Sequence, residues 1–198
     1  TIKGMHIQYT SSTVPSGIGS NAYVGLFAKV TGEVRNLKME DVNITNAYAS
    51  TTLYVGAITA HNTGTITNCM VSGIVSANEH GDNVGGIAGY NNGTISKSYN
   101  TATVIGYKYV GGIAGHNINA VENCYNTGSI SYKESSTNVY GYSGGIVGCN
   151  EGSSSSAKAT ITNCYNIGKI SGTSSSSAYA IGCNYSTYYS STTNSYYL

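Results

Sequence analysis

Short apolar runs alternate with Gly, Asn, Ser and Thr along the whole chain. The clearest run, Val-Gly-Gly-Ile-Ala-Gly-Tyr-Asn, covers residues 84–91. Related copies occupy 55–62, 110–117, 143–150 and 177–184, and a degenerate copy opens at Val24. Self-similarity at a near-constant interval is typical of repeat proteins. The sequence therefore predicts about six copies of one structural unit.

Two further apolar runs follow each copy. The first has the form Ile-Thr-Asn-Cys-Tyr, as at 161–165, and the second is a triplet such as Ala-Thr-Val at 102–104. Each run is too short for a helix and alternates with a period of two, as half-buried strands do. Gly and Asn between the runs are turn residues. We predict that each unit is a coil of three short strands.

A single coil cannot bury its own apolar face, whereas stacked coils share a continuous core. Parallel strands at about 4.8 Å would place equivalent residues directly above one another. We predict an all-β fold, a parallel β-solenoid of about six coils. Parallel crossovers favour a right-handed β-helix. Residues 1–198 are expected to form one repeat domain, in which 1–23 end a preceding coil and add a loop, and 24–198 form the coils.

Composition supports an ordered fold and excludes several classes of function. Only 9% of the residues are charged and the net charge is +1, so the chain has no basic surface for nucleic acid. Hydrophobic residues make up 40% of the chain, which argues against disorder. No run of about 18 apolar residues occurs, so we expect no membrane span.

The residues that acid–base catalysis needs are scarce, because Asp and Glu together number eight. Aligned by repeat, they fall in different columns or loops, and no two carboxylates stack in adjacent coils as glycoside hydrolysis would need. The carboxylates compared are Asp41, Asp82, Glu122, Glu134 and Glu151. No Ser-His-Asp set shares a column. We expect no catalytic residues and no cofactor.

Two columns of the aligned repeats are rich in Asn. Asn tolerates turn conformations, and stacked amides can hydrogen-bond to the copies above and below. We interpret both columns as structural ladders. Since Lys97 cannot be buried unpaired, the column that contains it is expected at a solvent-exposed bend. The first column is Asn62, Asn91, Asn117, Asn150 and Asn184, and the second is Asn36, Asn68, Lys97, Asn123, Asn163 and Asn194.

The five cysteines fall into two columns, Cys69 with Cys124 and Cys164, and Cys149 with Cys183. Stacked strands would bring their Cα atoms just inside disulfide range, so bonds are possible. The odd number and the apolar column favour reduced thiols that pack as small hydrophobes.

His116 shares its column with Cys149 and Cys183, which suggests zinc. The outer two would lie about 9.6 Å apart along the stack. Zinc holds its ligands at about 2.0–2.3 Å. We therefore predict no metal site.

A column of tyrosines, Tyr99, Tyr125, Tyr165 and Tyr196, is the candidate ligand-binding surface. Lys38 begins the column and suggests that it faces outward. Exposed tyrosines would suit sugar rings or protein partners. The alternative, which we favour, is that the rings cover the core at a corner with only their hydroxyls in water.

The run Gly-Gly-Ile-Ala-Gly-x-Asn-x-Gly-x-Ile, followed by Asn-Cys-Tyr-Asn-x-Gly, resembles the GLUG motif. Residues 85–95, 111–128 and 144–168 carry it. Such repeats occur in bacterial surface proteins, including adhesin-like proteins and the stalks of immunoglobulin A-cleaving metallopeptidases. The resemblance implies an extracellular, cell-surface or secreted location within a longer protein. No His-Glu-x-x-His occurs, so the metallopeptidase motif is absent from this sequence.

Three functions remain open. The first is a non-catalytic module for adhesion, with a host glycan or matrix protein as partner, or for spacing and presenting neighbouring domains of the same chain. The second is a carbohydrate-active β-helix enzyme, an analogy of fold alone that the scarcity of carboxylates disfavours. The third is an ice-binding solenoid, suggested by Thr65-x-Thr67 and Thr94-x-Ser96 but interrupted by Ala120-x-Glu122.

Overall fold

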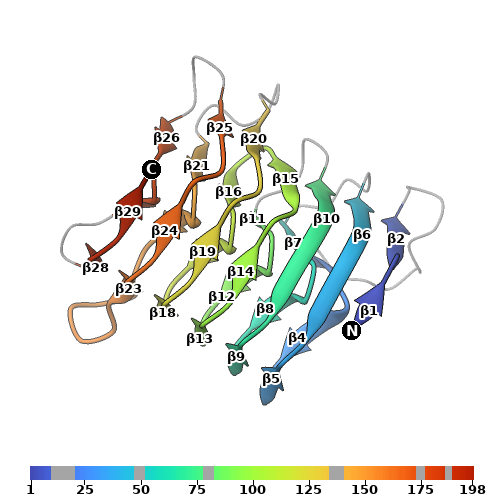
Figure 1. Ribbon diagram of the computed structural model, residues 1–198. Helices are drawn as coiled ribbons and strands as arrows, with labels where there is room; N and C mark the ends of the chain where they lie inside the picture. Colours follow the sequence, from blue (N-terminus) through green and yellow to red (C-terminus); the bar gives the residue numbers. More distant parts are fainter. Residues whose placement is uncertain (10–20, 47–51, 78–82, 134–140, 173–176, 186–188) are drawn as a thin grey trace.

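A computed structural model describes most of the chain, and its described residues form strands and turns without any helix (Figure 1). None of them therefore offers a helix that could span a membrane. Adjacent strands pair in parallel across successive coils, which confirms the all-β parallel solenoid. The described residues are 1–9, 21–46, 52–77, 83–133, 141–172, 177–185 and 189–198.

The strands form four sheets, here called A to D. Sheet A contains β1 (Ile2–Lys3), β2 (His6–Tyr9), β6 (Lys38–Asn46), β10 (Met70–Ala77), β14 (Tyr99–Asn100), β15 (Thr103–Gly106), β19 (Tyr125–Asn126), β20 (Ile130–Tyr132), β24 (Tyr165–Asn166), β25 (Ile170–Ser171) and β29 (Tyr196–Tyr197). Sheet B contains β3 (Asn21–Val24), β7 (Thr52–Gly56), β11 (Asn83–Gly85), β16 (Tyr109–Gly111), β21 (Tyr142–Gly144) and β26 (Ser177–Tyr179). Sheet C contains β4 (Phe27–Val30), β8 (Thr59–Asn62), β12 (Ala88–Asn91), β17 (Ala114–Asn117), β22 (Val147–Asn150) and β27 (Gly182–Asn184). Sheet D contains β5 (Glu33–Arg35), β9 (Thr65–Thr67), β13 (Thr94–Ser96), β18 (Ala120–Glu122), β23 (Ala159–Thr162) and β28 (Ser190–Thr193).

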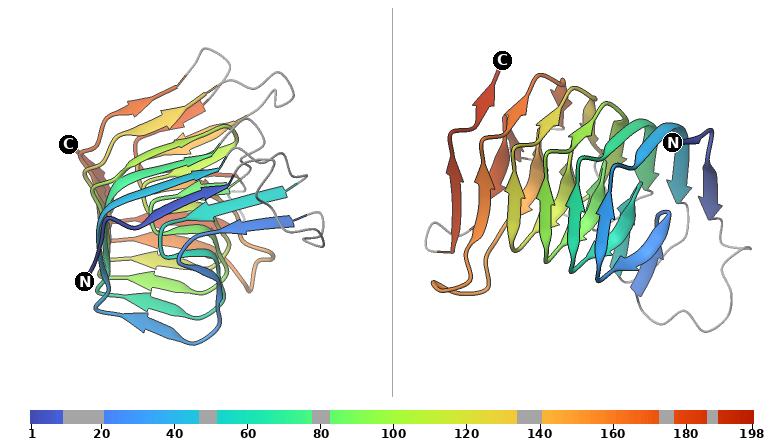
Figure 2. Two further views of the ribbon diagram at one scale, coloured as in Figure 1. Left: turned by 90° about the vertical axis from the view of Figure 1, so that its right-hand side faces the viewer. Right: turned by 60° about the horizontal axis from the view of Figure 1, so that its bottom comes forward.

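Each coil runs through sheets B, C, D and A in turn, and sheets B, C and D contain six strands each. Seen from the N-terminal end, the chain turns clockwise as it recedes, so the helix is right-handed (Figure 2, left). Before the first full coil, β1 and β2 pair with β6 and add a level to sheet A.

The prediction of three strands per coil was wrong, because two of the predicted runs bend inside their own motif. The first run turns at Gly86 and Ile87, between β11 and β12. The second turns at Lys97, which has a φ of 48°. A pattern of apolar spacing does not reveal a corner when the residues on both sides of it point into the core.

The corner between sheets B and C depends on glycine, because the two sheets approach backbone to backbone. A Cβ on Gly111 would lie 2.0 Å from the carbonyl oxygen of Ala114, and one on Gly115 would lie 2.4 Å from the amide nitrogen of Val84. Both distances are shorter than any side chain tolerates. The Gly-Gly-Ile-Ala-Gly motif is therefore the sequence of a sharp turn as much as that of a strand.

Aliphatic columns fill the interior from end to end in one cluster. Ile58, Ile87, Ile113 and Ile146 form one fully buried column. Burying each such side chain contributes roughly 1.5–3 kcal/mol. Because every coil shares this column with its neighbours, the core is continuous along the solenoid axis.

The first Asn column is a buried amide ladder. Asn62 Nδ2 donates to Asn91 Oδ1 at 2.7 Å, and the relay continues through Asn117 and Asn150 to Asn184. At Asn62, Asn91 and Asn117 the same amide also closes a turn within its coil, as in the bond from the Gly93 amide to Asn91 Oδ1. The ladder thus satisfies buried backbone groups at the corner between sheets C and D, where a strand pairing ends.

The second column has a different physical basis. Its members from Asn36 to Asn194, Lys97 included, have φ between 46° and 55°, the left-handed region that Asn tolerates better than most residues. The exposed amides of Asn68 and Asn36 are hydrogen-bonded at 2.7 Å, and those of Asn163 and Asn123 at 3.2 Å. Backbone conformation is therefore the main requirement at this bend between sheets D and A.

A third ladder was missed from the sequence. Asn100 Nδ2 donates to Asn126 Oδ1, and Asn126 Nδ2 donates to Asn166 Oδ1, both at 2.8 Å. All three amides are fully buried. The signal was present in the repeated Tyr-Asn pairs at 99–100, 125–126 and 165–166.

The two kinds of Asn column should respond differently to substitution. Asn117→Ala and Asn117→Gly should both lower the free energy of unfolding by about 2–4 kcal/mol, because each leaves buried partners unsatisfied. Asn123→Ala should lower it by about 1–2 kcal/mol, whereas Asn123→Gly should cost only a few tenths. Urea unfolding followed by circular dichroism measures all four variants. Equal losses for Asn123→Ala and Asn123→Gly would contradict the conformational explanation.

Candidate functional site

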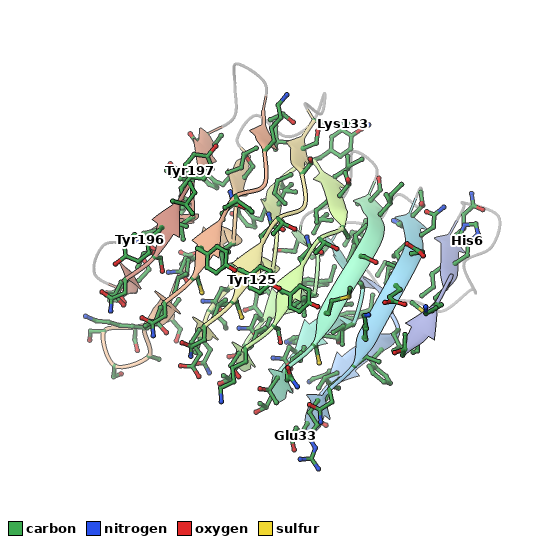
Figure 3. The ribbon with its side chains drawn as sticks, in the orientation of Figure 1. His6, Glu33, Tyr125, Lys133, Tyr196 and Tyr197 are labelled. Carbon is green, nitrogen blue, oxygen red and sulfur yellow. The ribbon has the colours of Figure 1, made fainter. Side chains whose placement is uncertain are left out.

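The predicted tyrosine column lies on the outer surface of sheet A, where Tyr125 is visible near its centre (Figure 3). Tyr99 and Tyr125 have ring centroids 4.6 Å apart with an interplanar angle of 5°. Tyr125 and Tyr165 follow at 5.0 Å and the same angle. The spacing of the rings equals that of the strands beneath them, so the rings stack because the strands are in register.

This stacking limits what the column can bind. The inner ring, Tyr125, has both faces close to a neighbouring ring, so it presents only its edge and hydroxyl to solvent. A sugar ring that stacks on tyrosine needs a free face. Among the described residues, the ring stack ends at Tyr165, although Tyr196 is its register partner. A free ring face is therefore expected only at the ends of the column.

A surface pocket of about 510 Å³ opens at the C-terminal end of the stack. Tyr196 is 64% exposed there, and Tyr165 is 40% exposed. Hydroxyls and amides next to a partly exposed ring can contact both the polar and the apolar faces of a ligand. The pocket is lined by Asn163, Cys164, Tyr165, Asn194 and Tyr196.

A second aromatic group lies at the corner between sheets B and C, where the chain reverses its direction (Figure 2, left). Outward side chains of the two sheets meet there: Tyr54 stacks on His61 at 6.3 Å, and Tyr109 packs on His116 at 5.2 Å. Tyr90 lies edge-on between the two histidines, 5.0 Å from His61 and 5.2 Å from His116. These rings cover the corner and make it half-buried.

His116, Cys149 and Glu151 come together at this corner. Their potential ligand atoms all lie within 4.8 Å of one another. His116 faces Cys149 across neighbouring strands, and Glu151 follows two residues after Cys149 on the same face. The column alignment missed Glu151 because it compared one position per coil, whereas the i, i+2 rule along a strand would have found it.

Burial sets the protonation of this group. Burial and the nearby Lys108 lower the pKa of His116 to about 4. The imidazole is therefore neutral at pH 7, and its 3.7 Å contact with Glu151 is not an ion pair there. Burial also raises the pKa of the Cys149 thiol well above its usual range.

All five cysteines are free and buried in the structure. The neighbouring Cys164 thiol and burial together raise the pKa of Cys124. Each also lies near the carbonyl oxygen two residues earlier, at 3.2 Å for Cys124 and 3.3 Å for Cys164. These thiols pack as small core residues.

The remaining carboxylates show no shared cleft among the described residues. Glu40 pairs with Lys3 at 2.8 Å and also with Lys38, and hydrogen bonds from these lysines lower its pKa to about 2. Glu122 lies on sheet D. Two of the carboxylates compared above, Asp82 and Glu134, lie outside the described residues.

The depressed pKa of His116 predicts a pH dependence. Between pH 6.5 and 4 the unfolded chain binds a proton at this residue and the folded chain does not, so stability should fall as the pH falls through that window. The loss attributable to His116 should approach about 3 kcal/mol at pH 4. Urea unfolding of the metal-free protein and of His116→Gln across this range tests it, because the variant should show the shallower slope. Parallel pH profiles would refute the assignment.

Comparison with known proteins agrees with the repeats. The GLUG motif matches residues 106–131 and 140–171. A search of curated proteins found no match. The chain is also similar to a crystal structure described as that of a "putative immunoglobulin A1 protease" from Bacteroides ovatus, with a TM-score of 0.74 and 23% sequence identity.

That similarity covers 99% of this chain and 57% of the other. At this identity it establishes a shared fold, and the chain spans little more than half the length of its structural neighbour. The middle of the chain, from Gly106 to Ser171 apart from a short gap, therefore consists of GLUG motifs on a parallel β-solenoid.

Proposed function

We propose that the chain is a non-catalytic β-helix module of a bacterial cell-surface or secreted protein, and that it spaces and presents neighbouring domains. The observation that carries the proposal is the continuity of the stack. One core cluster and long amide ladders join each coil to the next. Six coils at about 4.8 Å give a rise of about 29 Å.

Stiffness follows from how the coils are joined. Four strand pairings connect successive coils, and buried amides connect them again at two places, the corner between sheets C and D and within sheet A. Bending the stack would open parallel hydrogen bonds and expose buried amides, each at a cost of about 1–3 kcal/mol. A module of this kind holds its two ends at a set distance. The GLUG motifs and the fold shared with a bacterial protein support an extracellular location.

Adhesion is the second candidate, and the pocket beside Tyr165 favours it. Its half-exposed ring and neighbouring amides suit a host glycan or a loop of a matrix protein. Two other functions have weaker support. For a carbohydrate-active enzyme, the described residues offer no pair of carboxylates in one cleft. For ice binding, Glu33, Arg35 and Glu122 place charges in the Thr rows of sheet D.

Duplicating one coil tests the spacing role. Residues 84–109 span one repeat, since Val84 is the register partner of Val110. Inserting a second copy after Tyr109 should lengthen the separation between spin labels at Lys3 and Lys169 by about 4.8 Å and keep the distance distribution narrow. Double electron–electron resonance with genetically encoded labels measures both. A broad or unchanged distribution would rule out a rigid spacer.

A screen of glycans and matrix proteins tests the adhesive role. A ligand that uses the free face of Tyr165 should bind Tyr165→Ala about three- to tenfold more weakly. Tyr99→Ala is the matched control, because Tyr99 belongs to the same stack and lies outside the pocket. A screen without binders would eliminate adhesion for this chain and leave spacing. Release of reducing ends from a polysaccharide panel would overturn the non-catalytic proposal.

A further inference from the structure

The corner between sheets B and C brings three different metal-ligating groups to one point. His116 on β17 and Cys149 on β22 are register partners in neighbouring coils. Glu151 is the residue immediately after Asn150, the last residue of β22. Because side chains alternate along a strand, Cys149 and Glu151 project to the same side. The two coils therefore supply one nitrogen, one sulfur and one carboxylate.

The separations suit a shared ion better than direct bonds. His116 Nε2 and Glu151 Oε2 are 3.7 Å apart, beyond the 2.7–3.2 Å range of a hydrogen bond. Ligands held at 2.0–2.3 Å around a tetrahedral zinc ion lie about 3.3–3.8 Å from one another. All three ligand atoms fall within 4.8 Å. Shifts of about 1 Å or less in these side chains would complete the coordination.

An unpartnered nitrogen gives independent support. His116 Nε2 is buried and makes no hydrogen bond to any residue that the structure describes. A buried polar atom without a partner costs about 1–3 kcal/mol, so such atoms are uncommon. Its nearest carboxylate belongs to Glu151, whose side chain is 36% exposed and offers a route from solvent.

We propose that His116 Nε2, Cys149 Sγ and the Glu151 carboxylate bind a zinc ion, with water as the fourth ligand. A mixed nitrogen, sulfur and oxygen set suits zinc, whereas magnesium and calcium prefer oxygen alone. On binding, the Cys149 thiol loses its proton to solvent and the thiolate bonds to the metal. The ion joins the coil of β17 to the coil of β22.

The chain contains its own comparison site. His61 occupies the same column two coils earlier, and its Nε2 is likewise buried without a described partner. Its register neighbours are Lys29 and Tyr90, so neither a thiol nor a carboxylate is supplied by the adjacent strands. His61 should therefore bind no metal.

Metal content and cobalt spectroscopy of the untagged, reduced chain test the proposal. After equilibration with excess Zn²⁺ and dialysis, elemental analysis should find one zinc per chain. Co²⁺ should produce a thiolate-to-metal charge-transfer band. Cys149→Ser should abolish the band, and Glu151→Gln and His116→Gln should each weaken zinc binding by more than about tenfold. His61→Gln and Cys183→Ser should bind as the unaltered chain does.

Circular dichroism melts confirm that each variant is folded, and for the unaltered chain the melting temperature should rise with zinc concentration. Dialysed protein without stoichiometric zinc would overturn the proposal. So would binding that survives Cys149→Ser or Glu151→Gln in folded protein, or binding that Cys183→Ser removes. The zinc test and the test of the spacing role can fail separately, because the coil duplication leaves residues 110–198, and with them the three proposed ligands, unchanged.

Discussion

Parallel hydrogen bonding between successive coils holds each residue directly above its counterpart in the coil before. The register is uninterrupted in sheet D, where Thr65, Thr94 and Ala120 follow one another. Every other feature depends on this constraint. Equivalent positions in successive coils have the same environment and therefore accept the same kind of side chain, so aliphatic side chains, amides and rings each form columns. The near-absence of charge follows, because like charges would stack at about 4.8 Å.

The same constraint governs the surface. On sheet A it stacks tyrosine rings face to face, which stabilises the column. The stacked faces are covered by neighbouring rings, so a ligand cannot stack on them. Binding capacity is then concentrated where the column ends, beside Tyr165. At the corner between sheets B and C, the column changes identity from Tyr90 to His116 and Cys149. The register there places an imidazole beside a thiol, and these two groups can bind a metal ion together.

Repetition made much of the fold predictable. The columns of Ile87, Asn91 and Cys124 could be aligned by eye, and the structure stacks them as aligned. Corners were harder. Gly111 and Lys97 each lie inside an apolar run that spacing alone reads as one strand. The Asn100 ladder was not predicted, because Asn100 directly follows Tyr99 and the column was interpreted from its tyrosines alone.

The sequence alone determined that the chain forms stacked coils, roughly how many coils it has, and which residues share a column. Once the repeats are aligned, equivalent residues of successive coils must be register partners, whatever the shape of the coil. Only the tertiary structure decided how those columns meet. The turn at Gly86 and Ile87 folds sheet B against sheet C and brings Tyr109 onto His116. The alternation of side chains then sets Glu151 beside His116. Contacts between columns depend on the angles of the corners. Those angles arise from backbone packing at glycine, and the spacing of apolar residues does not reveal them.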